Sequence, residues 1–353
     1  MNRHIRNALI LTLAIKLLFL AYGNILRPPS NASDIFEVFM ENDSYWYLNI
    51  VENGYPSSEP QTHEQSAFAF FPLYPLLIAA FKVVFIHFGL SAFILSLALS
   101  CFWVWGIFQY MADLGFSTQK AFWLVAFLQV FPFHYFFHVF YTELLFSTIL
   151  IWLMIFSRQR QFIGILFLSF ALVLSRPTGL LFAFTIALSG LLQINIKQWL
   201  SSQLSYLGFI GAPIGIAAYS YFCYNRCGNP FIFSQNMNAW GRQYTWPWEP
   251  FFTPHVDLQI LIPYVIFLIA IGLIAAALNK GKQAIIIIPN LVMPLFTGSI
   301  ISYYRYVAVI HPIFQKLIGR FTWLCRPWVL VILFLFNLGT FTYWVLVHGV
   351  LSY

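Results

Sequence analysis

The acidic side chains are concentrated in one polar stretch, which runs from Glu41 to Pro75. It holds five of the 11 acidic residues of the 353-residue chain, namely Glu41, Asp43, Glu52, Glu59 and Glu64. Carboxylates are costly in or near hydrocarbon, and they are rare in membrane proteins unless they face water or have a functional role. Because a carboxylate can take a proton from a hydroxyl group, this stretch is the first candidate for general-base chemistry.

The pattern around the second of these acids predicts a short helix. Asn42 or Ser44 can cap it, and it runs to about Asn53, where Gly54 acts as the stop. Asp43 then lies in the first turn, where free N–H groups and the helix dipole stabilise a carboxylate. The alternative reading of Asp43 is a solvated loop acid without a chemical role.

A second group of polar residues lies in FPFHYFFHVFYTELLF, residues 131–146. His134 and His138 share one helical face, and Glu143 follows five residues later. Two histidines at this spacing with a nearby carboxylate could hold a divalent metal, but the order fits no defined motif and no third ligand is identified. Metal therefore stays an open possibility, with Glu143 and His138 as its candidate supports.

Two arginines lie at breaks between apolar segments. Arg176 stands in LSRPTGLL beside Pro177 and Gly179, and Arg305 stands between two tyrosines in SYYRYVAVIHP. At such positions an arginine either extends its head group to the interface or binds an anion. A guanidinium group is suited to the second task because it binds phosphate with two parallel hydrogen bonds.

Together these residues predict one outer cleft that contains Glu41, Asp43, Glu143, Arg176 and Arg305. This combination suits sugar transfer from a lipid-linked phosphate. A carboxylate can take the proton of an acceptor hydroxyl, and guanidinium groups can neutralise the phosphate that leaves. The chain has no P-loop and no soluble dinucleotide-binding segment, and this transfer needs neither.

The composition predicts an all-α polytopic membrane protein. Hydrophobic residues make up 60% of the chain, aromatic residues 20% and charged residues 8%. Windows of about 20 residues predict eleven spans. They lie near 7–24, 91–111, 120–137, 140–156, 161–175, 178–193, 203–222, 258–278, 283–301, 303–318 and 328–349. The segment 72–88 opens with prolines and is short, so we expect an interfacial helix there.

The distribution of basic residues predicts a cytoplasmic N-terminus and an outer C-terminus. Residues 1–22 resemble a signal peptide, but without a clear cleavage site they are expected to remain as the first span. Two long loops, 25–71 and 223–257, then lie outside, and the whole chain, 1–353, forms one membrane domain. In these loops Tyr47, Trp240 and Arg242 are candidates for sugar or loop contacts.

The net charge of +7 does not indicate nucleic-acid binding, because the basic residues are scattered over short loops. The four cysteines are expected to be structural thiols. No internal repeat is apparent, so the paired halves of many transporters are not indicated.

Several motifs resemble those of a known enzyme family. They are DSYWYLNIVENGY (43–55), AFFPLYP (69–75), Tyr141-Thr-Glu143, Ser175-Arg-Pro-Thr-Gly179 and Tyr304-Arg-Tyr306. In this order they resemble the second mannosyltransferase of the GPI-anchor pathway and its bacterial relatives. That family belongs to the GT-C class of integral-membrane glycosyltransferases, which use dolichyl- or polyprenyl-phosphate sugars.

The resemblance implies roles for individual residues. Asp43 would be the catalytic carboxylate, with Glu41 as its partner, although family members often have Trp where this chain has Asn42. Glu143 would support the acceptor or a metal, and Arg305 would contact the donor phosphate. Transfer would proceed with inversion at the anomeric carbon.

We therefore expect a GT-C-like enzyme that moves a hexose, with mannose the expected sugar, from a polyprenyl-phosphate donor to an acceptor hydroxyl. The acceptor is a glycan, a glycolipid or a protein, and the site faces outward from a bacterial plasma membrane. One alternative is a transporter or flippase of an anionic lipid or glycolipid, which predicts charges at mid-membrane and broken, symmetry-related spans. Another is a membrane scaffold without activity, which would tolerate Asp43→Asn.

Overall fold

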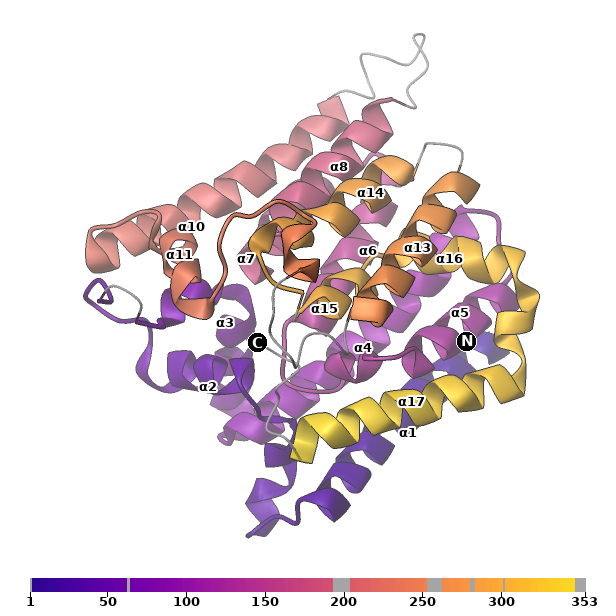
Figure 1. Ribbon diagram of the computed structural model, residues 1–353, viewed down its shortest axis with the longest axis horizontal. Coiled ribbons are helices and arrows are strands. Elements are labelled where there is room, and N and C mark those ends of the chain that lie inside the picture. Colours follow the sequence, from indigo (N-terminus) through magenta and orange to yellow (C-terminus); the bar gives the residue numbers. More distant parts are fainter. Residues whose placement is uncertain are drawn as a thin grey trace. The chain divides into compact units, whose positions relative to one another are not determined.

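The protein is built from helices, and the computed structural model describes residues 2–61, 64–192, 204–252, 262–279, 283–300 and 302–346 (Figure 1). No β-strand occurs in these ranges. A high content of apolar residues without period-2 alternation favours this outcome, because helices satisfy all their backbone hydrogen bonds within the segment.

Most helices lie where the hydrophobic windows predict them. The longer ones are α1 (Arg3–Leu26), α4 (Phe88–Asp113), α5 (Thr118–Val130), α6 (Glu143–Gln159), α7 (Phe162–Ser175), α8 (Gly179–Leu191), α10 (Gly211–Cys227), α13 (Ile262–Leu278), α14 (Ala284–Val292) and α17 (Pro327–Leu346). The window at 303–318 is divided into α15 (Tyr303–Ala308) and α16 (His311–Arg320). The parts of the predicted spans and of the loop 223–257 that fall in 193–203, 253–261, 280–282 and 347–353 lie outside the described residues.

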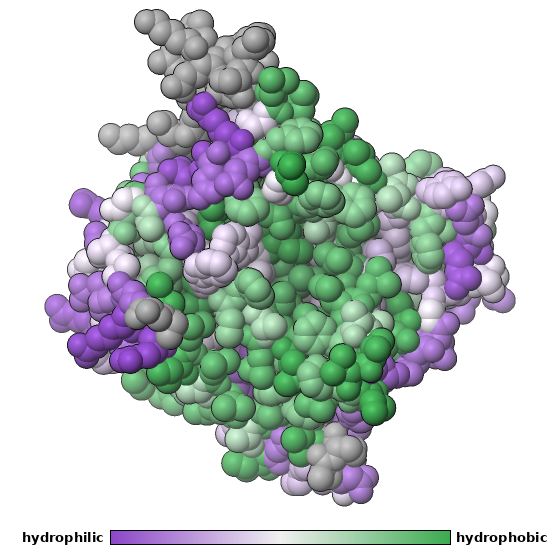
Figure 2. All heavy atoms as spheres, turned by 180° about the vertical axis from the view of Figure 1, so that it is seen from behind, coloured by the Kyte–Doolittle hydropathy of each residue, from purple (hydrophilic) through white to green (hydrophobic). Residues whose placement is uncertain are grey.

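Four helices in the described ranges are long and apolar enough to cross a membrane: Arg3–Leu26, Phe88–Asp113, Leu204–Cys227 and Pro327–Leu346. Apolar side chains predominate on the face drawn in Figure 2. On α17 alone, Val331, Ile332, Leu335 and Phe336 are at least half exposed. Such surfaces are unfavourable in water and favourable in lipid, so the chain is a membrane protein. The expected total of eleven spans stays a prediction.

The chain forms two compact units. Unit 1 comprises Met1–Leu48, Pro75–Ile155 and Phe314–Tyr353, and unit 2 comprises Asn49–Tyr74 and Phe156–Ile313. Each unit is therefore assembled from segments that are distant in the sequence. Four of the described helices contain a boundary between the units along the chain: α2 (Asp43–Asn53), α3 (Leu73–Phe85), α6 and α16.

In unit 1, α1 packs against α4, α5 and α17. The segment from 131 to 142 between α5 and α6 is not α-helical, yet every residue in it is buried. Irregular backbone at membrane depth is tolerated only where protein covers it and its polar groups have partners. Here Asn337 of α17 accepts a hydrogen bond from the Tyr135 N–H at 3.3 Å, and Lys16 of α1 donates to the Phe137 carbonyl at 3.1 Å.

In unit 2, α7 packs against α8 and α10, and α8 packs against α14. The short helix α15 packs against α13 and α14 and carries Arg305. Close packing depends on small residues: a Cβ added at Gly211 of α10 would lie 2.1 Å from the Leu166 carbonyl oxygen of α7. The fold of unit 2 thus holds α15 in a fixed position within the unit.

The segment expected at the interface forms α3 (Leu73–Phe85), a helix of 13 residues. At 1.5 Å per residue it extends about 20 Å, which is shorter than the hydrocarbon core of a bilayer. Tyr74 and Ile78 face inward, while Val83 and Val84 are 84% and 70% exposed. Its length is the same as that of α8, so length alone does not distinguish it from a predicted span, and its interfacial placement stays a prediction.

Candidate active site

Asp43 is the first residue of α2, so the predicted start of this helix is confirmed. The predicted end is confirmed as well, because Gly54 follows Asn53 with φ +74° and its N–H bonds to the Ile50 carbonyl at 2.9 Å. Asn42, between the two candidate catalytic acids, has φ +44°. Asparagine tolerates this left-handed conformation better than most residues, which explains why it can stand at this position.

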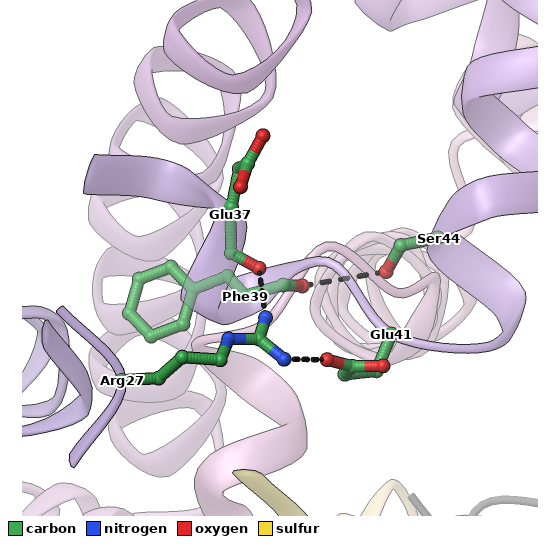
Figure 3. A network of polar contacts seen from close by, with 5 residues as sticks. All are labelled: Arg27, Glu37, Phe39, Glu41 and Ser44. Atoms are coloured by element: carbon green, nitrogen blue, oxygen red, sulfur yellow. Dashed lines mark hydrogen bonds and ion pairs between the residues drawn. The ribbon is translucent and has the colours of Figure 1, made fainter. Parts of the chain in front are cut away.

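Glu41 is buried and forms an ion pair with Arg27, as Figure 3 shows. The second guanidinium nitrogen of Arg27 donates to the Glu37 carbonyl at 3.0 Å. Arg27 therefore connects the end of α1 to both ends of the turn 37–41. The ion pair with Arg27 occupies one of the two carboxylate oxygens of Glu41.

The turn that carries Glu41 is also attached to the buried segment 131–142. The Phe140 N–H donates to the Phe39 carbonyl at 3.2 Å. The buried Ser44 hydroxyl shares its proton between the carbonyl oxygens of Phe39, at 3.3 Å, and Phe140, at 3.1 Å. These bonds bring the acidic turn close to Glu143, which is only three residues beyond Phe140.

His138 and Glu143 are buried, with 1% and 0% of their surface exposed. The His138 ring stacks on Phe19 of α1 at a centroid distance of 4.9 Å. Burial lowers the pKa of His138 well below its ordinary value, and the charges of Lys16 and His134 lower it further. The imidazole is therefore neutral at pH 7 and can act as a hydrogen-bond donor and acceptor.

The described ranges contain no group of three or more His, Cys, Asp or Glu residues that could hold a metal ion. The prediction that His134 and His138 share one helical face is wrong, because Phe133 is left-handed and residues 134–137 form only a 3-10 turn, but the two histidines lie close enough to interact electrostatically. His134 packs on Phe137, with ring centroids 4.0 Å apart, so both histidines are in part packing residues.

Unit 2 contains an arginine cluster, defined here as Arg176, Arg242 and Arg305 around Tyr306. Arg242 donates to the Tyr306 hydroxyl at 2.7 Å and to the Ser302 hydroxyl at 3.3 Å. The Arg176 guanidinium lies over the Tyr306 ring, 5.3 Å from its centroid. Arg305 is 3% exposed.

The pKa of Tyr306 shows how the charges act together. Burial raises the pKa of this phenol, but the positive charges of Arg242, Arg176 and Arg305 outweigh burial and hold it below its ordinary value. All three guanidinium groups thus act electrostatically on the side chain of Tyr306. A local excess of positive charge that already favours a phenolate also favours a bound anion.

The two long polar loops meet within unit 2, as expected if both lie on one side of the membrane. Asn236 donates to the Glu64 carbonyl at 2.7 Å, and its side-chain oxygen accepts from the Ser66 N–H at 3.1 Å. Trp240 packs edge-on against Phe70 at 5.4 Å. Tyr47 in unit 1 is 4% exposed. Trp240 and Tyr47 therefore have packing roles, and their predicted sugar contacts are untested.

Within each unit the structure connects a different set of the predicted residues, and the single outer cleft expected from the sequence stays a prediction. Glu41, Asp43, His138 and Glu143 belong to connected segments of unit 1, and Arg176, Arg242 and Arg305 form the cluster of unit 2. Sequence reasoning missed Arg27, and it gave Tyr306 no role beyond its place in the Tyr304-Arg-Tyr306 motif. It also missed Lys16, although a lone lysine in the middle of an apolar span is itself a signal of a functional or structural role.

Comparison of the chain with protein-family models and with curated proteins finds no significant match.

Proposed function

We propose that this chain is an integral-membrane glycosyltransferase of the GT-C type, with more spans than the four long helices. It moves a hexose, with mannose the expected sugar, from a polyprenyl-phosphate donor to an acceptor hydroxyl. The acceptor belongs to a glycan, a glycolipid or a protein at the outer face of the membrane. The N-terminus is cytoplasmic, and the expected location is a bacterial plasma membrane.

The observation that carries this proposal is the arginine cluster. The chain has 18 basic residues, and three of them lie around Tyr306: Arg305 precedes it in the sequence, Arg242 donates to its hydroxyl at 2.7 Å, and the Arg176 guanidinium lies 5.3 Å from its ring centroid. A local concentration of guanidinium groups attracts anions. In a membrane protein the most abundant anionic group within reach is a lipid-borne phosphate, and arginine binds phosphate with two parallel hydrogen bonds.

In the proposed reaction the acceptor oxygen forms a bond to the anomeric carbon of the sugar, and the bond from that carbon to the phosphate oxygen breaks. The acceptor proton passes to the carboxylate of Asp43. The phosphate changes from a diester with one negative charge to a monoester with two. Guanidinium groups can stabilise such an additional charge, and we assign this role to the arginine cluster on its geometry within unit 2.

We assign Glu41 a positioning role rather than the role of a second base. Its ion pair with Arg27 occupies one carboxylate oxygen, which leaves that oxygen less available to accept a proton from an acceptor hydroxyl. Through Arg27 it fixes the turn 37–41 and hence the backbone of Asp43. His138, neutral and buried, and Glu143 support the acceptor side from the attached segment 131–142.

The test is binding of polyprenyl phosphate to the protein in detergent. Arg242→Gln, Arg176→Gln and Arg305→Gln should each weaken binding, and the matched control is Arg226→Gln. Arg226 lies in the same unit but donates to the Tyr55 carbonyl at 2.8 Å and is not among the charges that act on Tyr306. Loss of one charge-assisted contact corresponds to roughly 1.5–3 kcal/mol, or about 10- to 150-fold in affinity. If the three cluster variants bound polyprenyl phosphate as tightly as the wild type and the Arg226→Gln control, the arginine cluster would not be the phosphate site.

A further inference from the structure

An exposed aromatic segment follows Arg242 of the arginine cluster along the chain and has no role in the proposed reaction. It runs from Tyr244 to Phe252, and its large side chains are turned outward. Tyr244 is 96% exposed, Trp246 60%, Trp248 55% and Phe252 81%. A buried aromatic ring is stabilised by about 1.5–3 kcal/mol relative to an exposed one, so four exposed rings in water would be unfavourable.

The exposure is built into the backbone. The Gln243 N–H donates to the Thr297 carbonyl at 3.2 Å, and the Thr245 N–H donates to the Phe296 carbonyl at 3.1 Å. Bonds from alternate residues are typical of an extended chain, in which residues 244 and 246 share one face. Pro247 and Trp248 then form a turn that leads into the short 3-10 helix Glu249–Phe251. The Gly298 backbone, at φ +72°, approaches so closely that an added Cβ would lie 2.9 Å from the Gln243 carbonyl oxygen.

The two tryptophans form a fixed pair within this segment. Their ring centroids are 5.2 Å apart, and the ring planes are inclined by only 5°. Pro247, between them, limits the backbone further because its φ is fixed. The two stacked rings therefore present one continuous aromatic surface.

The position of residues 296 and 297, to which the segment is hydrogen-bonded, indicates what covers this aromatic surface. Residues 296 and 297 are the last of an apolar helical run, Ala284–Thr297. The end of an apolar helix is where a chain leaves the hydrocarbon, and Trp and Tyr are enriched at that boundary because they combine an apolar ring with a polar atom. Glu249 is the only charged residue between 243 and 252, and it is exposed.

We propose that the segment 244–252 lies in the headgroup layer of the membrane, with the Trp246–Trp248 pair at the boundary of the acyl chains. Arg242 is two residues before Tyr244, so their Cα atoms are at most about 7 Å apart. The arginine cluster then lies at the depth of the lipid phosphates. If the proposed function holds, on which this last step rests, the donor phosphate reaches the cluster without leaving the headgroup layer.

The test uses the full chain in nanodiscs of phosphatidylcholine, with and without a phosphatidylcholine brominated on its acyl chains. Bromine quenches tryptophan emission at short range. The double variant Trp246→Phe, Trp248→Phe keeps aromatic rings but removes their emission, so the difference from the wild type reports these two residues. Trp240→Phe is the matched control, because Trp240 packs against Phe70.

We expect brominated lipid to quench most of the emission that the wild type has in excess of the double variant, and aqueous iodide to leave it unchanged. The emission that the wild type has in excess of Trp240→Phe should respond to neither quencher. If iodide quenched the emission of Trp246 and Trp248 and brominated lipid did not, the proposal would be wrong. Protection from iodide by a soluble oligomannoside would then identify a saccharide site instead. The two proposals fail separately, since binding of polyprenyl phosphate to the arginine cluster is measured without these tryptophans.

Discussion

Asn42 illustrates how a single residue can determine the geometry of the candidate site. With φ +44°, it turns the chain between Glu41, which pairs with Arg27, and Asp43, which begins α2. A left-handed conformation costs most residues roughly 1–2 kcal/mol, and more for a β-branched one.

We therefore expect Asn42→Val to abolish sugar transfer, because relief of the strain would displace Asp43. Asn42→Gly should retain most activity, since glycine adopts positive φ without steric cost. Transfer activity and thermal midpoint are measured for both variants. If the valine variant were as active as the glycine variant, the left-handed turn would have no part in positioning Asp43.

Tyr306 predicts a pH dependence of phosphate binding. Its pKa lies below its ordinary value because of the three arginines, so the phenol ionises as the pH rises toward 10. The phenolate that forms neutralises part of the positive charge and competes with a bound anion. Affinity for polyprenyl phosphate should therefore be highest near neutral pH and fall at alkaline pH.

Tyr306→Phe removes the titrating group and keeps the ring under Arg176. This variant should show a flatter affinity profile between neutral and alkaline pH, measured by the same binding assay. Arginine itself does not titrate in this range. An unchanged alkaline decrease in the Phe variant would show that another group causes it.

At the scale of elements, the segment 131–142 is the part of unit 1 that the hydropathy windows describe least well. Its apolar composition predicted the continuation of two spans, yet Pro132 interrupts α5, and Phe133 has φ +63°. A window average counts apolar residues and cannot register where the backbone turns. The partners of this turn, Asn337 and Lys16, are more than 100 residues away along the chain.

Asn337→Leu tests whether this buried segment depends on its distant partners. Asn337 accepts from the Tyr135 N–H and donates to the Gln129 carbonyl at 3.4 Å. Leucine has a similar volume but leaves both groups buried without a partner, at a cost of about 1–3 kcal/mol. We expect a lower thermal midpoint, which is measured by size-exclusion chromatography after the protein has been heated in detergent.

Thr340→Val is the matched control on the same helix. Its hydroxyl donates only to the Asn337 carbonyl of α17 itself, at 2.8 Å, so its loss should have a smaller effect. Equal midpoints for the two variants would mean that Asn337 does not hold the segment 131–142.

At the scale of the whole molecule, the sequence predicted the class and the helix positions well, because hydrophobic content and period are local properties. It also predicted the limits of α2, since Gly54 and Asn42 act through their own backbone conformations. It could not predict that Arg242 would join Arg176 and Arg305 on Tyr306, because this cluster depends on how α15 packs within unit 2. The role of Glu41 could not be predicted either, since its partner Arg27 is positioned by α1.

The most direct test of the proposed function is transfer of radiolabelled mannose from polyprenyl-phosphate mannose into membrane lipids and glycans. Wild type is compared with Asp43→Asn at matched expression, and Glu52→Gln on the same helix is the control. We predict that the wild type and the Glu52 variant form a labelled product and that Asp43→Asn does not. Equal transfer by Asp43→Asn and wild type would contradict the assignment of Asp43 as the catalytic carboxylate, and no transfer above empty membranes by any of them would contradict the proposed transfer of mannose itself.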